Sequence, residues 1–346
     1  MTKRITRRSL IQGAAALPVA LSAPAFVRAQ VRQLVIGGPG GQEAQTRRLF
    51  IPQFEQQHNC KVLYDGGQTL PNLKKLQVSP KNPPFDVVMM DEPGTILAAK
   101  DDLLEPLHPS RVKNLTKLAP GSIMKDGAWI VYMNPAISIG YNSRALPEGV
   151  KSWELLWDKR MRERVMIPHP KTTQAAAMLA MAAHLDTGKP IKDAQYDMDA
   201  AFRRLKQMKP NLLQSYLASA QASILLEQGE AWMAPGFFTT YTLGRKAAGA
   251  PVDMAKPAEG SFAYPKVIAK VRNAAAPELA DAWIDACIGE DFQKIWMREF
   301  YSAPTNTGVP VDPALIPSSD LHVLDMEFHT RMIGEVSQRF DREIGS

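Results

Sequence analysis

Short apolar runs that alternate with helix-like stretches are the feature that most constrains the fold of this chain. The run Phe85–Met90 is apolar except for one aspartate, which is typical of a parallel strand covered on both faces. Before it, Gln33–Ile36 and Cys60–Tyr64 are strand-like, and each precedes a stretch with large apolar residues at helical spacing. Strands that alternate with helices indicate an α/β fold, in which ligands are expected at the carboxyl ends of the strands.

The alternation resumes after residue 136 and continues to about residue 287. A helix is predicted over residues 42–57, and Pro52 is expected to kink it or to shorten its first turn. Further strands are predicted at Ser138–Tyr141, Val165–Ile167, Ala231–Met233 and Tyr264–Ile268, and further helices over 175–185, 196–208, 216–228 and 278–287. Pro235 and Gly236 are expected to end the strand before them. The length suggests two domains.

Residues 1–29 are predicted to be an export signal. Basic residues precede the apolar run 11–26, and small residues surround a cleavage position after Ala29. Within the signal, Thr6–Ile11 resembles a twin-arginine motif; an ordinary signal with two arginines by chance is the alternative. No cysteine stands at the cleavage position, where Gln30 follows Ala29, so we expect a soluble periplasmic protein without a lipid anchor.

The signal also accounts for most of the positive charge of the chain. It contains five basic residues and no acidic one, so its removal lowers the formal net charge from +6 to +1. Net charge therefore gives no reason to expect a nucleic acid or an anionic membrane as partner. Cys60 and Cys287 are the two cysteines; they could pair in an oxidising compartment or remain buried thiols.

Several segments match a known family in order and spacing. They are Cys60–Tyr64, Phe85–Asp91, Ile139–Asn142, Ser152–Trp157, Glu227–Ala231, Gly249–Asp253 and Ser302–Asn306. Over nearly the whole chain after the signal, the sequence resembles the type II periplasmic solute-binding proteins of the spermidine/putrescine-binding family. The resemblance implies a two-lobed α/β fold with two crossing hinge strands and a ligand in the cleft between the lobes.

The resemblance also implies the limits of the lobes and the partners of the protein. Lobe one is expected to comprise residues 31–135 and 261–304, and lobe two residues 136–260 and 305–346. A small-molecule solute would close the lobes by a hinge motion, and an ABC permease in the inner membrane would receive it. We expect a monomer that needs no cofactor and binds no nucleic acid.

Candidate ligand contacts in lobe one lie where its strands end. The first group is the glycine-rich loop with Pro39, Gly40, Gly41, Gln42 and Glu43. Its backbone N–H groups at a helix start could seat a carboxylate or phosphate, although an ordinary tight turn would have the same composition. The second group is Asp91 and Glu92, which could pair with a ligand amine. Alternatively, Asp91 caps the following helix.

Candidate contacts in lobe two fall into three groups. Lys171, Thr172 and Thr173 precede a predicted helix, and one of the threonines is expected to be its N-cap. Phe238 and Tyr241 follow a strand and could form the wall of a pocket, or pack in the core of lobe two. Tyr264 lies in the second crossing.

The solute is inferred from departures from the family pattern. Polyamine binders set carboxylates in lobe two and at the second crossing, where this sequence has Pro170, Thr173 and Pro265, with Lys171 and Lys266 beside them. The crossing aromatic falls on Ala263, next to Tyr264. A buried dication would lack its charge partners, which is costly. The expected solute is therefore a small zwitterion, such as an amino acid, a GABA-like acid or an aminophosphonate, with a polyamine retained as a further possibility.

Two other classes of function are a periplasmic sensor and an exported enzyme. A ligand-presenting periplasmic sensor would have the same sequence features as a transport protein. An exported enzyme is disfavoured because the chain has no GxSxG, HExxH, P-loop or GxGxxG motif. No catalytic or metal-ligating residues are therefore assigned.

Overall fold

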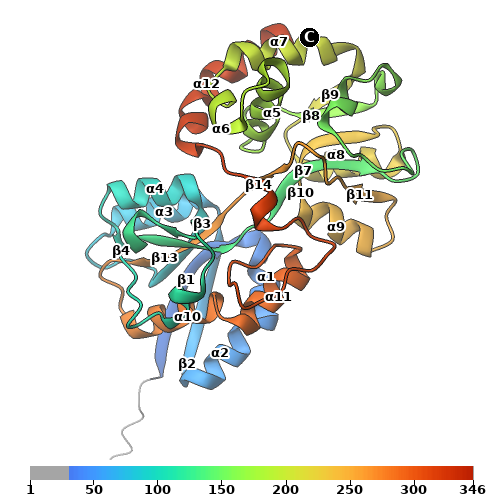
Figure 1. The fold of residues 1–346 in the computed structure, drawn as a ribbon. Helices are drawn as coiled ribbons and strands as arrows, with labels where there is room; N and C mark the ends of the chain where they lie inside the picture. The colour runs from blue at the N-terminus through green and yellow to red at the C-terminus, as the bar shows by residue number, and fades with distance from the viewer. Residues whose placement is uncertain (1–30, 346) are drawn as a thin grey trace, which may run out of the picture. The chain divides into compact units, whose positions relative to one another are not determined.

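The computed structural model describes residues 31–345, so the predicted export signal over residues 1–29 lies outside the described residues. Two seven-stranded sheets organise the chain (Figure 1). The strands of the first sheet are β1 (Arg32–Pro39), β2 (Cys60–Gly67), β3 (Val87–Asp91), β4 (Leu104–Glu105), β5 (Ile123–Met124), β6 (Trp129–Met133) and β13 (Lys266–Val271). Their order is β2-β1-β3-β13-β6-β5, and β4 pairs with β13.

Both faces of the first sheet are covered by helices. These are α1 (Glu43–Leu49), α2 (Ile51–His58), α3 (Thr69–Val78), α4 (Glu92–Lys100), α10 (Pro277–Cys287) and α11 (Glu290–Phe300). Strand β3 shows the two-sided burial directly, because Val87 and Met89 belong to one apolar cluster and Val88 and Met90 to another. Strands β1, β2 and β3 pair in parallel, as predicted for a buried strand of this composition.

The second sheet has the order β14-β12-β7-β10-β8-β9, and β11 pairs with β7. Its strands are β7 (Ala136–Asn142), β8 (Val165–Pro168), β9 (Leu212–Tyr216), β10 (Met233–Phe238), β11 (Val252–Met254), β12 (Ser261–Ala263) and β14 (Leu321–His322). The accompanying helices are α5 (Ala175–Thr187), α6 (Ile191–Ala194), α7 (Met198–Met208), α8 (Ser219–Gln228), α9 (Thr239–Ala247) and α12 (Met326–Glu343). The C-terminal helix α12 packs beside α7 (Figure 1).

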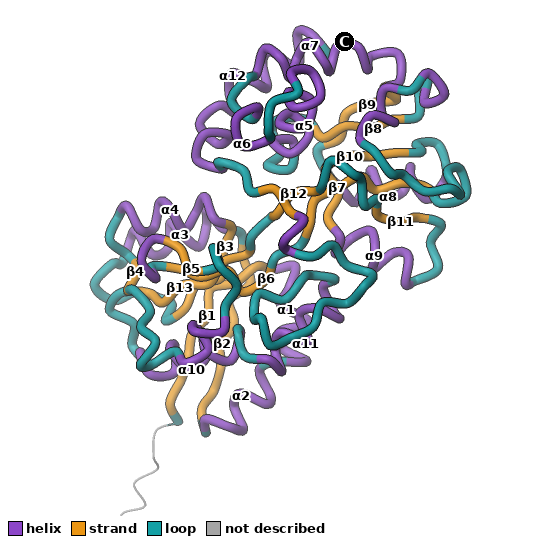
Figure 2. Tube along the Cα trace, in the orientation of Figure 1, coloured by secondary structure: helices purple, strands orange, loops and turns teal. Residues whose placement is uncertain are grey.

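Two short segments join the sheets (Figure 2). Strand β6 ends at Met133 in the first sheet and β7 begins at Ala136 in the second. Strand β12 ends at Ala263 in the second sheet and β13 begins at Lys266 in the first. Residues 134–135 and 264–265 are therefore the crossings. The predicted α/β class with two crossing strands is confirmed.

Several element boundaries differ from the sequence prediction. The helix expected over 42–57 is divided at Phe50, two residues before Pro52, because proline lacks the N–H that would continue the ladder. The predicted helix 216–228 begins at Ser219, and residues 212–216 form β9 instead. The first strand continues to Pro39, and the crossing strand begins at Lys266 rather than at Tyr264.

The prediction that Pro235 and Gly236 end a strand is wrong. Strand β10 continues through both residues to Phe238, and its pairing with β7 shifts register between Pro235 and Phe237. Gly236 has φ +83°, a backbone conformation that residues other than glycine rarely adopt. It forms a bulge within the strand. The bulge lets β10 reach the region of the crossings.

The two cysteines do not form a disulfide. Cys60 and Cys287 are free, buried thiols in an apolar cluster on one face of the first sheet. Of the alternatives that the sequence left open, the structure has the buried thiols. Among residues 31–345, no helix is both long enough and apolar enough to cross a bilayer.

Candidate functional site

A cavity of about 550 Å³ lies at the two crossings, and we call it the cleft. Seven of the residues predicted from the sequence line it: Pro39, Gly41, Gln42, Thr173, Phe238, Tyr241 and Tyr264. Their positions are the end of β1 and the residues after it, the loop before α5, the end of β10, the start of α9 and the second crossing. The cleft is therefore built from both sheets and from the chain that joins them.

The second crossing presents alternate side chains to opposite sides. Tyr264 and Lys266 line the cleft, whereas Ala263 and Pro265 line a different cavity of about 320 Å³. Successive residues of extended chain point in opposite directions, so a shift of one residue exchanges the two sets. The resemblance placed the ligand-holding crossing positions of polyamine binders on Ala263 and Pro265. In the structure, their neighbours Tyr264 and Lys266 face the cleft.

Lys266 forms an ion pair with Asp91 at the end of β3. The Nζ of Lys266 lies 2.5 Å from Oδ1 of Asp91 and 4.6 Å from the ring centroid of Tyr264. Its side chain is 21% exposed. Burial acts to lower the pKa of Lys266, but the neighbouring Tyr264 and Asp91 outweigh that effect and raise this pKa above its ordinary value. The ammonium group of Lys266 is therefore protonated at neutral pH.

Asp91 has a different role from either one predicted. Its carboxylate accepts hydrogen bonds from Lys266 and from the hydroxyl of Thr69. It occupies the N-cap position of α4, but its side chain makes no capping hydrogen bond, so the predicted cap is wrong. Asp91 is also not among the residues that line the cleft. The ammonium group that it binds belongs to the protein itself.

Aromatic rings form one wall of the cleft. The rings of Phe238 and Tyr264 meet edge to face with centroids 4.9 Å apart, and Tyr241 follows at 6.5 Å from Phe238. The Tyr264 hydroxyl and the Thr173 hydroxyl are 3.0 Å apart, which joins the crossing to the loop before α5. Burial raises the pKa of Tyr264, so its phenol is neutral at pH 7. This wall suits the apolar body of a small molecule.

Two buried amides supply directional polar groups. Gln42 is 7% exposed, and its Oε1 accepts a hydrogen bond from the Tyr132 hydroxyl at 2.8 Å. Its Nε2 makes no protein hydrogen bond in the part of the chain that is described, and the residue lines the cleft. Gln174 is 8% exposed; its Nε2 donates to Ser219, so its Oε1 is the end that remains available. The cleft therefore contains one amide donor and one amide acceptor with fixed orientations.

The other predicted site residues lie outside the cleft. Glu43 pairs with Arg47 at 2.8 Å, and Gly40 packs against the backbone of β2. Glu92 lines the cavity on the other face of the crossing, where burial raises its pKa. Lys171 is bound through its backbone N–H to the His169 ring. The remaining two, Asp91 and Thr172, have their side chains bonded to other parts of the protein.

Neither threonine caps α5, so that prediction is also wrong. The N-cap is Gln174, which makes no capping bond with its side chain. The hydroxyl of Thr172 donates to the His169 carbonyl, and that of Thr173 pairs with Tyr264. Both hydroxyls are thus engaged away from the helix start.

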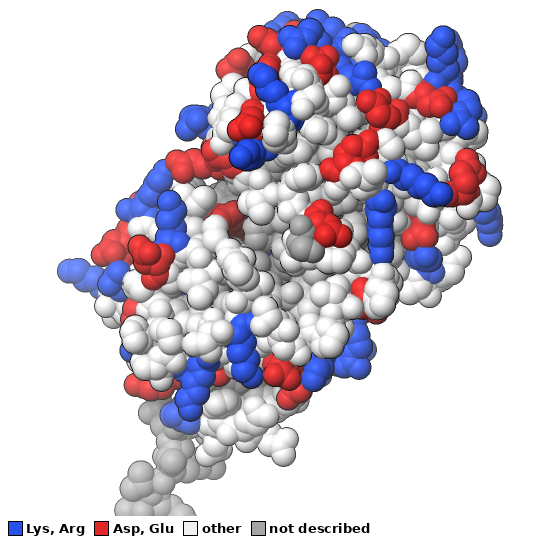
Figure 3. Space-filling model, viewed as in Figure 1, with Lys and Arg blue, Asp and Glu red and all other residues white. Residues whose placement is uncertain are grey.

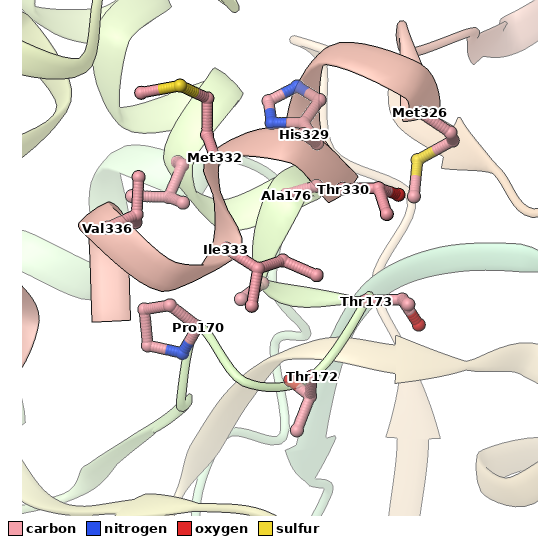
Figure 4. Close-up of a pocket in the computed structure, with 12 residues that line it drawn as sticks. Pro170, Thr172, Thr173, Ala176, Met326, His329, Thr330, Met332, Ile333 and Val336 are labelled. Carbon is pink, nitrogen blue, oxygen red and sulfur yellow. The ribbon is translucent and has the colours of Figure 1, made fainter. Parts of the chain in front are cut away.

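A much smaller cavity, of about 20 Å³, lies between the loop before α5 and helix α12. Pro170 and Thr172 border it on one side, and His329 and Ile333 of α12 border it on the other (Figure 4). It has room for about one water molecule, so it is not a solute site. Burial lowers the pKa of His329 to about 4. The cavity marks where the C-terminal helix supports the loop that carries Thr173.

Sequence reasoning missed several residues of the cleft. They are Gln45, Met133, Pro135, Gln174, Thr240, Gly244, Arg245, Glu299, Phe300 and Tyr301, together with Lys266, which was noted only as a neighbour of Pro265. Counting every second residue from Tyr264 would have found Lys266. Glu299 and Tyr301 end helix α11, and no local pattern places that helix end at the crossings. The face shown in Figure 3 has acidic and basic side chains interspersed rather than a field of one sign.

Comparison with known proteins identifies the family. A family model of bacterial extracellular solute-binding proteins matches residues 82–330. The chain belongs to this family. It is 23% identical to the spermidine/putrescine-binding periplasmic protein of Escherichia coli K12 over 256 residues, which cover 71% of this chain and 70% of the relative. The family resemblance read from the sequence is therefore confirmed.

Solved structures show the same fold. A putative extracellular solute-binding protein from Bordetella parapertussis superposes with a TM-score of 0.80 at 20% identity, covering 90% of this chain and 98% of that one. The Atu4243 GABA receptor gives a TM-score of 0.73 at 20% identity, with coverages of 89% and 96%. The fold is that of type II periplasmic binding proteins. The family and the fold are therefore those of extracellular solute-binding proteins.

Proposed function

We propose that this solute-binding protein captures one small polar organic solute in the cleft and delivers it to an ABC permease of the inner membrane. The observation that supports this best is the composition of the cleft lining, to which both sheets and both crossings contribute. A cavity of about 550 Å³ is within the range of small-molecule sites. A solute that contacts both halves would favour their closure about the crossings.

The moving bodies follow from the hydrogen bonds of the crossings and of the tail. We propose residues 31–135 with 264–304 as one lobe and residues 136–263 with the C-terminal tail as the other. The boundary expected at residue 261 lies three residues later, because β12 (Ser261–Ala263) pairs with β7 and β14 in the second sheet. The boundary near residue 305 shifts slightly, because the Thr305 carbonyl accepts from Ala119 N–H at 2.8 Å and Thr307 N–H donates to the Lys117 carbonyl at 2.9 Å. Residues 305–308 therefore move with lobe one.

Periplasmic location is part of the proposal. It is supported by the signal-like sequence of residues 1–29 and by the name of the E. coli relative. Expression of the full chain with its own N-terminus tests it: the exported protein should begin after Ala29, as read by intact mass. Export should fail when Arg7 and Arg8 are both changed to lysine if the signal is of the twin-arginine type.

Native mass spectrometry of the mature protein, residues 30–346, tests solute capture. We expect one small molecule bound per monomer in protein purified under mild conditions. Extended dialysis should remove that molecule and leave the mass of the protein alone. The same molecule should be recovered with unchanged mass after prolonged incubation with the protein. Conversion of the bound molecule into a product of different mass would contradict a binding role and indicate an enzyme.

A further inference from the structure

We infer that the solute carries a carboxylate or phosphate group and that Lys266 and Gln42 hold this group in the cleft. The inference rests on the proposed function and adds the chemical class of the solute. Polyamines, which relatives bind by name, would be excluded by the same arrangement.

The charges of the cleft point first to Lys266. Three charged side chains line the cavity: Lys266, Arg245 and Glu299. Arg245 makes two hydrogen bonds to Glu227, at 2.7 and 2.6 Å, and is 54% exposed; Glu299 pairs with an arginine at 3.2 Å and is 37% exposed. Lys266 is the least exposed of the three. Electrostatic interactions are strongest where water is excluded, so Lys266 is the best placed of the three to act on a ligand inside the cleft.

The ammonium group of Lys266 has hydrogen-bonding capacity left for a ligand. It has three N–H donors, and Asp91 accepts one of them. Within residues 31–345, no other protein acceptor lies within hydrogen-bond distance of this Nζ. Asp91 is not part of the cleft lining, although Lys266 is. The cleft therefore presents the ammonium group and not the carboxylate that neutralises it.

Gln42 supplies a second donor to the same cavity. The Tyr132 hydroxyl donates to its Oε1, which orients the amide so that the NH₂ end is the one without a protein partner among the described residues. Carboxylate and phosphate oxygens only accept hydrogen bonds, and such bonds are stronger when the group is ionised. A cationic ligand would instead meet a like charge at Lys266 and a donor at Gln42.

The rest of the lining describes the remainder of the solute. The rings of Phe238, Tyr241 and Tyr264 offer a surface for a short aliphatic or cyclic body. The Oε1 of Gln174 has no protein donor among the described residues and could accept from a hydroxyl or a single ammonium group. Small acids, including zwitterionic amino acids, match this lining, whereas a linear dication does not.

Isothermal titration of the mature protein, first freed of retained solute by unfolding and refolding, tests the inference. The acids are 4-aminobutyrate, succinate and glucose 6-phosphate, each compared with a counterpart that lacks the acidic group: 4-aminobutanamide, which keeps its ammonium group, succinamide and glucose. Spermidine completes the panel. We expect at least one acid to bind, and its counterpart to bind at least about tenfold more weakly.

Two variants assign the effect to Lys266. Lys266→Gln should weaken binding of that acid by roughly ten- to a hundredfold, the range for loss of a charged hydrogen bond. It also leaves Asp91 without its ammonium partner, so the variant should bind spermidine more tightly than the wild type. The double variant Asp91→Asn/Lys266→Gln should lose the acid without gaining spermidine. Lys75→Gln is the matched control, because Lys75 pairs with Asp65 at 2.6 Å outside the cleft, and it should bind the acid like the wild type.

The inference is overturned if none of the three acids binds, if a counterpart without the acidic group binds as tightly, or if Lys266→Gln retains acid affinity within twofold. Binding of spermidine alone by the wild type would also overturn it. That last result would leave the proposed function standing with a different solute. A wild-type protein that retains and binds no small molecule at all would contradict both proposals.

Discussion

Two lysines four residues apart on β13 have opposite roles. Lys270 is completely buried, and its Nζ lies 3.0 Å from an Asp281 oxygen and 3.1 Å from a Glu105 oxygen. Lys266 is 21% exposed, has Asp91 as its one carboxylate partner, and lines the cleft. Lys270 therefore has its charge paired within the core, whereas Lys266 on the same strand keeps N–H donors that no protein acceptor among the described residues uses. The difference lies in the number of acceptors around each Nζ, which is a property of the tertiary structure.

Replacement of the buried lysine should have the largest effect on stability. Lys270→Ala leaves Asp281, which is 4% exposed, with Arg111 at 3.3 Å as its remaining cationic partner. Breaking a buried pair costs about 3–5 kcal/mol when the remaining charge has no partner, so the loss here should reach at most that range, whereas replacement of the whole pair by apolar residues is often tolerated. Urea denaturation should show that loss for Lys270→Ala, and a smaller loss for Lys270→Met/Asp281→Leu. Unchanged stability in Lys270→Ala would show that the pair is not what holds this part of the sheet.

His329 is a buried basic residue that, unlike Lys270, has a ring nitrogen without a hydrogen-bond partner among the described residues. His329 is 6% exposed, its Nε2 has no hydrogen-bond partner within the described chain, and burial lowers its pKa from 6.5 to about 4 despite the nearby Asp325. The unfolded chain binds a proton at this histidine near pH 6.5, whereas the folded chain does so only near pH 4. Folding stability should therefore fall as the pH is lowered from about 6.5 to about 4, by up to about 3 kcal/mol from this group.

Thermal or urea unfolding of His329→Leu between pH 7 and pH 4 checks this expectation. The variant should lose less stability over that interval than the wild type does. His108→Gln is the control for replacement of a histidine, because His108 is exposed. Parallel curves for the wild type and His329→Leu would contradict the account of His329.

Replacement of Tyr264, two residues before Lys266, should change the free energy of unfolding less than replacement of Lys270 or His329 does. Tyr264→Phe removes the hydroxyl that is 3.0 Å from Thr173 and keeps the aromatic wall. We expect a loss of about 1 kcal/mol in the free energy of unfolding, the usual contribution of one hydrogen bond. Thr173→Val should cost about the same, and the double variant should cost less than the sum of the two. Additive effects in this double-mutant cycle would argue against a direct hydrogen bond.

Lys266 itself should contribute least to stability. Its pair with Asp91 is partly exposed, so Lys266→Gln should change the free energy of unfolding at pH 7 by less than about 1 kcal/mol without solute. Because the pKa of Lys266 is raised on folding, its contribution is complete below the unfolded pKa of about 10.4 and is lost as the pH rises through the folded pKa. A large loss of stability at pH 7 would place Lys266 with Lys270 as a structural lysine.

The sequence predicted the layout of the protein better than the details of its cleft. Alternating strands and helices predicted the α/β class. The family resemblance predicted lobe boundaries at residues 135/136 and 260/261, of which the second lies about three residues before the observed crossing. The bulge at Gly236 was not predicted, because Pro-Gly is far more common in turns than inside a strand. Its effect is to extend β10 to Phe238, and therefore to set where the aromatic wall begins.

Side-chain direction at the crossing is the step that sequence reasoning could not make. Ala263 and Pro265 face one cavity and Tyr264 and Lys266 the other, and a shift of one residue in the assumed register reverses that assignment. Likewise, Asp91 was predicted as a partner for a ligand amine, but the nearest ammonium group is that of Lys266, which is 175 residues away in sequence. Pairings over such distances depend on the order of strands in the sheet.

The most direct test of the account is the charge of the molecule that the cleft retains. Wild-type protein and Lys266→Gln are purified in parallel, denatured, and the released small molecules analysed by mass spectrometry in both ion modes. The account predicts an acidic molecule, detected as an anion, in stoichiometric amount from the wild type and strongly reduced in the variant. Release of a polyamine or an uncharged sugar from the wild type, or equal amounts of the same acid from both proteins, would contradict it.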